Sequence, residues 1–333
     1  MKYLVPGWAH RPGAHCASTA ISDAMTFRGL DLSEAMCFGL GSGLGFAYFE
    51  HPRMSPSRMT ATRNRLLEPR FFEALGQPFD WLREPEPRAA LEAVKQHLAE
   101  RTPVLLRADI AHLPYYRTAT HFPPHVVGIW GFDDERETAF IADTGWTGLQ
   151  EVPYSDLEKA RYGGNAYLQN QAEHFPVTGP DQIENLPAAA RRAIAQQAKD
   201  LIGLELEIKA VFGFDGMSAA ARAIPHWGQA PDWQWCARWF YQVIEKRGTG
   251  GGAFRLLYSR FLEEIAGLDP AFKTIAPAGQ MKTIAAAWTE LSLLLKEISE
   301  QDDPGRLAAA ARLLSEIAEA ERKFFTGALE RLL

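Results

Sequence analysis

Cysteine is scarce in this sequence, and its scarcity excludes several classes of protein. The 333 residues contain three cysteines, Cys16, Cys37 and Cys236. An odd number at such wide spacings gives no disulfide framework, and no C-x-x-C pair marks a structural zinc module. We therefore expect a cytoplasmic protein, because free thiols are common in that reducing compartment.

Long apolar runs and an excess of basic residues are also missing. No segment approaches the uninterrupted apolar stretch of about 18 residues that spans a membrane. Pro6-Gly7 breaks the N-terminus too early for a signal peptide. Lys and Arg number 35 against 41 Asp and Glu, which gives a formal net charge of -6. Since no basic run accompanies aromatic residues, we expect neither a nucleic-acid partner nor a membrane partner.

The chain does have enough apolar material for a large core, and its composition changes near residue 175. Hydrophobic residues make up 47% of the chain. Residues 1–175 are rich in Gly, Pro and aromatic residues, whereas residues 176–333 are rich in Ala, Leu and charged residues at helical spacing. The change predicts two domains, an α+β domain followed by an all-α helical bundle.

The periodicity also predicts the individual elements of both domains. In the first domain we expect helices at 17–28, 33–38, 88–101 and within 54–70, and strands at 103–109, 125–132 and 137–142. In the second domain we expect helices at 187–211, 217–224, 232–246, 253–266, 279–300 and 305–332.

Cys16 is the first candidate functional residue. It follows Gly13-Ala-His15 and precedes an apolar run that is predicted to be a helix. Free backbone N–H groups and the macrodipole at a helix N-terminus favour negative charge, so a thiol placed there ionises more easily. This position favours a nucleophile.

His125 and Asp143 lie on the two predicted strands of a hairpin. With the turn centred on Asp134, His125 would pair directly with Asp143. A slip of one residue would turn the two side chains to opposite faces unless a bulge restored them. If the pairing holds, Asp143 orients His125, His125 ionises Cys16, and the three form a Cys-His-Asp nucleophilic site.

Two alternative interpretations of Cys16 stay open. The thiol can be an inert core residue, as Cys37 and Cys236 are expected to be. It can also join His10, His15 and a later histidine in a zinc site, but no C-x-x-C pair supports this, and we expect no metal ion.

Alternating glycines follow residue 38 and include Gly41 and Gly43. They predict a permissive loop that passes close to a substrate, because glycine allows a close backbone approach. A plain connection between helices is the alternative.

A second glycine-rich segment, Arg247-Gly-Thr-Gly-Gly-Gly252, enters a predicted helix that contains Arg255. Backbone N–H groups there, with Thr249 and the two arginines nearby, are a candidate site for a phosphate or carboxylate. A tight turn between helices is the alternative.

Several motifs together are similar to a known family. Those in the first domain resemble the N-terminal domain of the butirosin-biosynthesis protein H family, and one in the second resembles the uncharacterised helical domain often fused behind it. The motifs are Gly13-Ala-His-Cys-Ala-Ser-Thr-Ala20, the glycine-rich run from Gly29 to Phe46, Leu113-Pro-Tyr-Tyr, His121-Phe-Pro-Pro-His125-Val-Val-Gly and Arg247-Gly-Thr-Gly-Gly-Gly-Ala-Phe-Arg-Leu-Leu-Tyr.

The resemblance implies a papain-like cysteine-peptidase type of fold and an acyltransferase activity. By this resemblance Cys16 would be the nucleophile, His125 the base and Asp143 the orienting acid. The donor would be an acyl carrier protein or another pantetheine thioester, and the acceptor a small-molecule amine in specialised-metabolite biosynthesis. Pantetheine would enter only as part of the substrate, with no other cofactor. A homo-oligomer is compatible with this expectation.

The resemblance also raises a question about the oxyanion. Papain-type enzymes usually place a glutamine before the nucleophile, but the first glutamine of this chain is Gln77. His10, with His15 as a weaker candidate, or the Cys16 N–H would have to donate instead.

The helical domain would cover the active site or bind substrate, and aromatic side chains would exclude water from it. The aromatic residues concerned are Trp8, Tyr115, Tyr116, Trp130 and Trp146. The alternatives to acyl transfer are an amide or peptide hydrolase with the same triad and a non-catalytic binding module.

Overall fold

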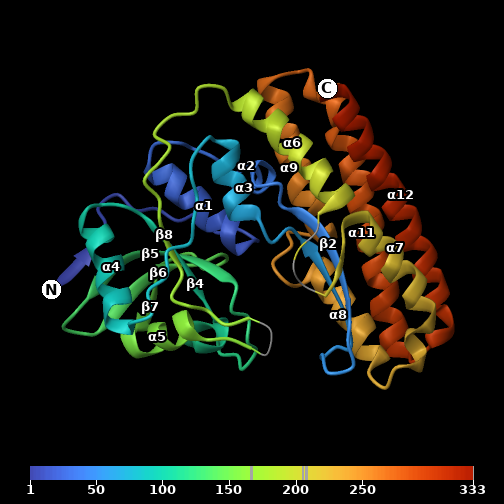
Figure 1. Ribbon diagram of the computed structural model, residues 1–333, viewed down its shortest axis with the longest axis horizontal. Helices are drawn as coiled ribbons and strands as arrows, with labels where there is room; N and C mark the ends of the chain where they lie inside the picture. The colour runs from blue at the N-terminus through green and yellow to red at the C-terminus, as the bar shows by residue number, and fades with distance from the viewer. Residues whose placement is uncertain (166–167, 205, 207–208, 333) are drawn as a thin grey trace. The chain divides into compact units, whose positions relative to one another are not determined.

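The computed structural model describes residues 1–165, 168–204, 206 and 209–332. The chain divides into two compact units (Figure 1). The sheet unit comprises Met1–Cys37 and Leu75–Glu184, and the helical unit comprises Phe38–Ala74 and Asn185–Leu333. This division differs in two respects from the expected domains, 1–175 and 176–333. The second unit begins later, and residues 38–74 belong to it because their strands pair and pack within that unit.

The sheet unit is built on an antiparallel sheet, which with its helices confirms the α+β prediction. The strands follow the order β7-β6-β5-β4-β8, and β1 pairs with β5. They are β1 (Lys2–Leu4), β4 (Val104–Ala108), β5 (His125–Asp133), β6 (Thr138–Ala142), β7 (Gln150–Pro153) and β8 (His174–Pro176). The three strands predicted in this region are confirmed as β4, β5 and β6.

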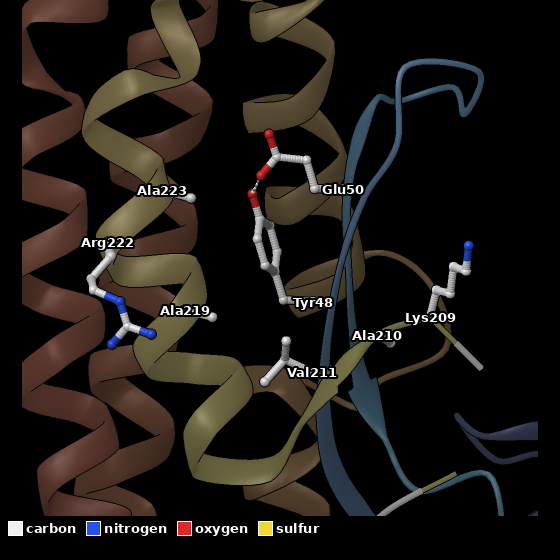
Figure 2. A pocket seen from close by; sticks show the side chains of 8 residues that line it. All are labelled: Tyr48, Glu50, Lys209, Ala210, Val211, Ala219, Arg222 and Ala223. Carbon is white, nitrogen blue, oxygen red and sulfur yellow. Dashed lines mark hydrogen bonds between the residues drawn. The ribbon is translucent and has the colours of Figure 1, made fainter. Parts of the chain in front are cut away.

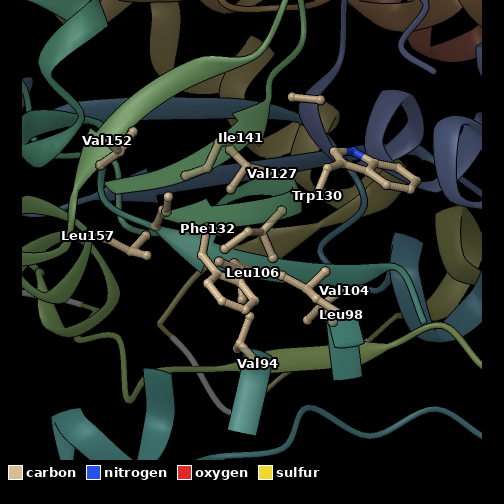
Figure 3. Close-up of a cluster of buried hydrophobic side chains, with 14 of the residues drawn as sticks. Val94, Leu98, Val104, Leu106, Val127, Trp130, Phe132, Ile141, Val152 and Leu157 are labelled. Atoms are coloured by element: carbon tan, nitrogen blue, oxygen red, sulfur yellow. The ribbon is translucent and has the colours of Figure 1, made fainter. Parts of the chain in front are cut away.

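Helices α1 (Cys16–Phe27), α4 (Pro87–Ala99) and α5 (Tyr154–Tyr162) pack on this sheet, and two short 3-10 turns, η1 (Ile110–His112) and η2 (Pro114–Tyr116), follow β4. Figure 3 shows Val94 and Leu98 of α4 against Val104 and Leu106 of β4. All four side chains are almost completely buried. Each side chain of this size stabilises the fold by about 1.5–3 kcal/mol when it is fully buried.

The helical unit combines a small antiparallel sheet with a helical bundle. The sheet order is β3-β2-β9, with β2 (Leu44–Glu50), β3 (Arg58–Arg63) and β9 (Val211–Phe212). The helices are α3 (Leu67–Ala74), α6 (Leu186–Gly203), α7 (Gly213–Ala223), α8 (Trp233–Glu245), α9 (Arg255–Leu268), α10 (Phe272–Ile275), α11 (Ala278–Gln301) and α12 (Leu307–Leu332), with the 3-10 turns η3 (Ile224–Gln229), η4 (Gly252–Phe254) and η5 (Pro304–Arg306). Helix α2 (Glu34–Leu40) crosses the boundary between the units.

Two predicted helices differ from the structure. The stretch 54–70 contains strand β3, and its helix, α3, begins only at Leu67. Thr60 and Thr62 are buried on one face of β3, a period of two that favours a strand. The helix predicted at 187–211 ends at Gly203, and residues 205, 207 and 208 of that prediction lie outside the described residues. Across the described parts of the chain, none of the helices is both long and apolar enough to cross a lipid bilayer.

Candidate active site

Cys16 is the first residue of α1, as the sequence predicts. His15 is the N-cap, in an extended conformation, and its Nδ1 accepts a hydrogen bond from the Ser18 N–H at 3.3 Å. The Gly13 N–H donates to the Thr144 carbonyl at 2.8 Å, which ties the turn before Cys16 to the end of β6. Cys16 is 8% exposed. The sulfur therefore lies at a fixed helix N-terminus, where the macrodipole favours a thiolate.

His125 and Asp143 are in direct contact. His125 Nε2 lies 2.9 Å from both carboxylate oxygens of Asp143. The Tyr115 hydroxyl donates to Asp143 Oδ2 at 2.6 Å, and the Thr144 hydroxyl donates to Oδ1 at 2.7 Å. Both His125 and Asp143 are buried. The carboxylate is thus held by several donors and fixes the orientation of the imidazole.

The contact does not arise from the predicted direct pairing, which is wrong. Strands β5 and β6 pair Gly128 with Ala142, and this register, extended beyond β6, would place Gly145 opposite His125. Asp143 is then the diagonal neighbour on the same face, within reach of a side chain. A bulge at Trp130 makes this possible, because β5 carries one residue more than β6 between the pairs Ile129–Ile141 and Gly131–Phe140.

The charges of the site favour a protonated imidazole at His125. Burial lowers the pKa of His125, but the charge of Asp143, and then the charge and hydrogen bond of Cys16, raise it to about 10. Burial raises the pKa of Asp143, but His125, Tyr115 and Thr144 lower it overall. Since His125 Nε2 faces Asp143, Nδ1 is the ring nitrogen left for the sulfur. The predicted Cys16, His125 and Asp143 therefore come together in the structure.

Aromatic rings surround this site, although only some of the predicted ones. The Trp146 ring centroid lies 4.9 Å from that of Tyr115 and 4.7 Å from that of Tyr116. The Tyr116 hydroxyl is 3.1 Å from His125 Nε2. Burial and the charge of Asp143 raise the pKa of both tyrosines, which keeps them neutral donors.

Two other predicted aromatic residues belong to the core. Trp130 is part of the main hydrophobic cluster of the sheet unit, and its ring meets Phe27 edge-on. Trp8 packs against the same cluster from a partly buried position. Neither contact involves the three candidate catalytic residues.

The structure places His10 beside the site. Its Nδ1 contacts Asp23 Oδ2 at 2.5 Å. Burial lowers the pKa of His10, but the hydrogen bond and charge of Asp23, the Trp146 backbone and the charge of Asp143 raise it overall. The role of His10 as an oxyanion donor stays a prediction, whereas His15 caps α1 through its ring nitrogen.

Glu34 is a residue that the sequence did not single out. Its Oε1 accepts hydrogen bonds from the N–H groups of Ala14 and His15 at 2.9 and 2.6 Å, and from the Thr19 hydroxyl at 3.1 Å. A Cβ on Gly13 would lie 2.9 Å from the other carboxylate oxygen. One carboxylate thus holds the whole turn that precedes the nucleophile, and no local sequence pattern signals a contact across twenty residues.

Gly41 and Gly43 lie within the helical unit, and Gly43 is closely packed there. Both are buried in the turn between α2 and β2. A Cβ on Gly43 would lie 2.6 Å from the Phe38 ring. Close packing alone therefore explains the absence of a side chain there, and contact with a substrate stays a prediction.

Anion binding at the second glycine-rich segment stays a prediction, and the structure shows local partners for several of its donors. The Gly251 N–H donates to Thr249 Oγ1, and the Gly252 N–H donates to the Glu245 carboxylate, at 3.1 and 3.2 Å. The Arg247 guanidinium stacks 4.1 Å from the Trp239 ring and donates to Gln242. The backbone donors are therefore used inside the turn, where an acidic side chain already faces them.

Arg255 is likewise used inside the helical unit. Its Nε and Nη2 donate to Glu321 at 2.7 and 2.9 Å, and Nη1 donates to the carbonyls of Thr62 and Ala253. Both ion-pair partners are fully buried. The guanidinium therefore joins α9, α12 and β3, and most of its donors are used within the helical unit.

The helical unit also has an open cavity of about 510 Å³ that the sequence did not reveal. Figure 2 shows Tyr48 and Glu50 of β2, joined by a hydrogen bond of 2.9 Å, and Arg222 of α7. The remaining lining residues are Lys209, Ala210, Val211, Ala219 and Ala223. The cavity therefore offers both acidic and basic groups beside small apolar side chains.

Comparison with known families agrees with the two-part architecture. Residues 15–144 match the family model described as Butirosin biosynthesis protein H, N-terminal, and this match includes Cys16, His125 and Asp143. Residues 155–328, more than half of the chain, match the model described as Domain of unknown function (DUF4872). The chain belongs to this second family, with the butirosin-type domain in front of it. The predicted resemblance is confirmed for both parts. None of the curated proteins compared with the chain matches it.

Proposed function

We propose that the protein is a cysteine-dependent acyltransferase that moves an acyl group from a carrier-protein or other pantetheine thioester to an amine. The observation that carries the proposal is the Cys16 thiol at a helix N-terminus, hydrogen-bonded to a His125 that Asp143 orients. The description of the matched N-terminal family supports a biosynthetic enzyme. Specialised-metabolite assembly is the role that we propose.

In the first half-reaction the Cys16 thiolate attacks the thioester carbonyl of the donor. The carbon–sulfur bond to pantetheine breaks, and His125, which holds the proton from the Cys16 thiol, gives it to the departing sulfur. The enzyme then carries the acyl group as a thioester. One thioester replaces another, so this step is nearly neutral in energy.

In the second half-reaction an amine attacks the acyl-Cys16 carbonyl. His125 takes a proton from the attacking nitrogen, and the Cys16 thiolate leaves, so that an amide is formed and the initial state returns. This step is downhill, because an amide is more stable than a thioester. Tyr115, Tyr116 and Trp146 would keep water from competing with the amine.

The oxyanion of both tetrahedral intermediates needs hydrogen-bond donors, and this chain has no glutamine before Cys16 to provide one. We assign this role to the Cys16 N–H and to the ring of His10, whose Nδ1 contacts Asp23. Loss of one such donor typically costs about 10²–10³ in rate. We assign substrate binding to the helical unit, whose cavity carries groups of both charges.

An intact-mass experiment tests the proposal. The protein is mixed with acyl-loaded carrier proteins, and we expect a single acyl adduct that is absent in Cys16→Ser and that a candidate amine discharges. Discharge by buffer alone at the same rate would indicate a hydrolase instead. The absence of any adduct, together with no alkylation advantage of Cys16 over Cys37 and Cys236, would indicate a non-catalytic binding module.

A further inference from the structure

A second group of chemically versatile side chains lies in the sheet unit, outside the set that carries the proposed reaction. Asp109 directly follows β4, His112 is the last residue of η1, and His121 lies shortly before β5. Each of the three offers one ligand atom, and these atoms all lie within 4.8 Å of one another. The sequence analysis did not predict this cluster, because its members come from a segment with no regular spacing.

Asp109 has the features of a preorganised ligand. Its side chain is completely buried. Oδ1 accepts hydrogen bonds from the N–H groups of Phe122 and Ala111 at 2.8 and 3.3 Å, so that Oδ2 is turned toward His121 Nδ1 at 2.6 Å. The backbone N–H groups thus fix Oδ1 and leave Oδ2 for one further interaction. Hydrogen bonds of this kind also orient carboxylates that bind metal ions.

The negative charge of the Asp109 carboxylate also requires compensation, because the side chain is buried. A buried carboxylate is costly unless positive charge or several donors compensate it. In the described ranges of the chain, the ion pair found for Asp109 is the one with His121, whose side chain is 46% exposed. A cation bound by Asp109 and His121 would add positive charge beside this carboxylate.

His112 completes the group. Its ring centroid lies 5.7 Å from that of His121, with the planes at 68°. No hydrogen bond of the His112 ring is found among the residues that the structure describes. His112 is partly buried and His121 is exposed, so an ion could enter from solvent.

We propose that Asp109, His112 and His121 bind a divalent transition-metal ion of the zinc class, with water at the remaining position. Two imidazole nitrogens and one carboxylate oxygen suit such ions, whereas calcium and magnesium take oxygen ligands. Bonds of about 2.0–2.2 Å place tetrahedral ligand atoms roughly 3.4 Å apart. Small side-chain rotations bring the observed atoms to that spacing.

The bound ion would have a structural role and would not take part in catalysis. Asp109 and His121 bracket the segment that carries Tyr115 and Tyr116, and the tyrosine hydroxyls contact Asp143 and His125. A bond network between the two ends of the segment would restrict its opening and keep the tyrosines on the catalytic pair.

A spectroscopic titration of the full chain tests the proposal. It uses a Cys16→Ser variant, because a thiolate is itself a strong ligand for these metals. The metal-free protein is titrated with Co²⁺ in the visible range and with Zn²⁺ by calorimetry. We expect one equivalent of each, Co²⁺ bands typical of tetrahedral nitrogen and oxygen ligation, and a melting midpoint that Zn²⁺ raises by several degrees.

Variants locate the ion. His112→Gln should weaken binding at least about 10-fold while leaving the melting of the metal-free protein nearly unchanged, since the described residues offer this ring no hydrogen bond that the substitution would remove. His121→Gln should weaken it as well. His226→Gln, which removes an exposed imidazole from the helical unit, is the matched control and should bind normally.

Two outcomes would overturn the proposal. One is no stoichiometric binding of either ion, and the other is binding that both His112→Gln and His121→Gln leave intact, which would mean an adventitious ion only. Because the test is made without the Cys16 thiol and reads no activity, its result is independent of the proposed acyl transfer.

Discussion

Replacing Asp143 with asparagine tests whether its charge is what ionises the Cys16–His125 pair. The raised pKa of His125, about 10 instead of 6.5, corresponds to roughly 5 kcal/mol in favour of the imidazolium, and Asp143 is the largest cause that raises it. Asparagine keeps the shape of the side chain but carries no charge. Burial lowers the pKa of His125, and in this variant less negative charge opposes that effect. The pKa of His125 should therefore fall, and the proton should return to the Cys16 sulfur.

The rate at which iodoacetamide alkylates Cys16 reports this change across pH. In the wild type we expect fast alkylation already at pH 6.5, with a further change only near pH 10, where His125 loses its proton. A thiol with the ordinary pKa of about 8.5 is only roughly 1% ionised at pH 6.5. Since a thiolate of low pKa is also a weaker nucleophile, the expected net loss in Asp143→Asn at pH 6.5 is about 10-fold.

A matched control separates charge from hydrogen bonding. Thr144→Val removes the hydroxyl that donates to Asp143 at 2.7 Å but keeps the carboxylate, so its profile should stay close to the wild type. Cys37 and Cys236 are buried and serve as internal references in the same mass spectra. An Asp143→Asn profile that superimposes on the wild-type profile would refute the reasoning, as would an equal loss in Thr144→Val.

Three further substitutions have defined outcomes. In Glu34→Gln, loss of a negative charge beside the N-terminus of α1 should shift the acid limb of Cys16 alkylation to lower pH, and an unshifted limb would contradict this. Arg255→Met should lower the free energy of unfolding by about 3–5 kcal/mol in urea titrations, because it leaves Glu321 buried without its partner. Gly13→Ala should destabilise the protein by about 1–3 kcal/mol in the same assay, because the new methyl carbon would lie 2.1 Å from the Thr19 hydroxyl oxygen and 2.8 Å from the Glu34 carboxylate carbon. Wild-type stability of this variant would show that the turn rearranges to accept the methyl group.

The candidate catalytic residues could be predicted because their signals are local. Cys16 stands at a helix start that capping and apolar spacing reveal, and His125 and Asp143 stand near the ends of two short apolar segments that are buried strands. The register between the strands could not be predicted. It depends on the bulge at Trp130, and a bulge leaves no residue pattern that differs from a regular buried strand.

Contacts between residues far apart in the chain could not be predicted, for a different reason. Composition assigned residues 38–74 to the first domain, yet strand β2 pairs with β9, whose residues lie far along the chain. The contact of Glu34 with the turn before Cys16 and the meeting of Asp109 with His121 are likewise tertiary. Periodicity describes which face of an element is apolar, but it does not say which distant element covers that face.

The division of the chain has a consequence for its biosynthesis. The polypeptide passes from one unit to the other three times, after residues 37, 74 and 184. A ribosome therefore releases the β2–β3 hairpin well before helices α7 and α8, which pack on its strands, have been synthesised. For the same reason, no single truncation yields either unit intact. A stop codon after residue 184 would leave the hairpin without the rest of its unit. Deleting residues 38–74 and joining the flanking segments would give a chain that contains the sheet unit alone.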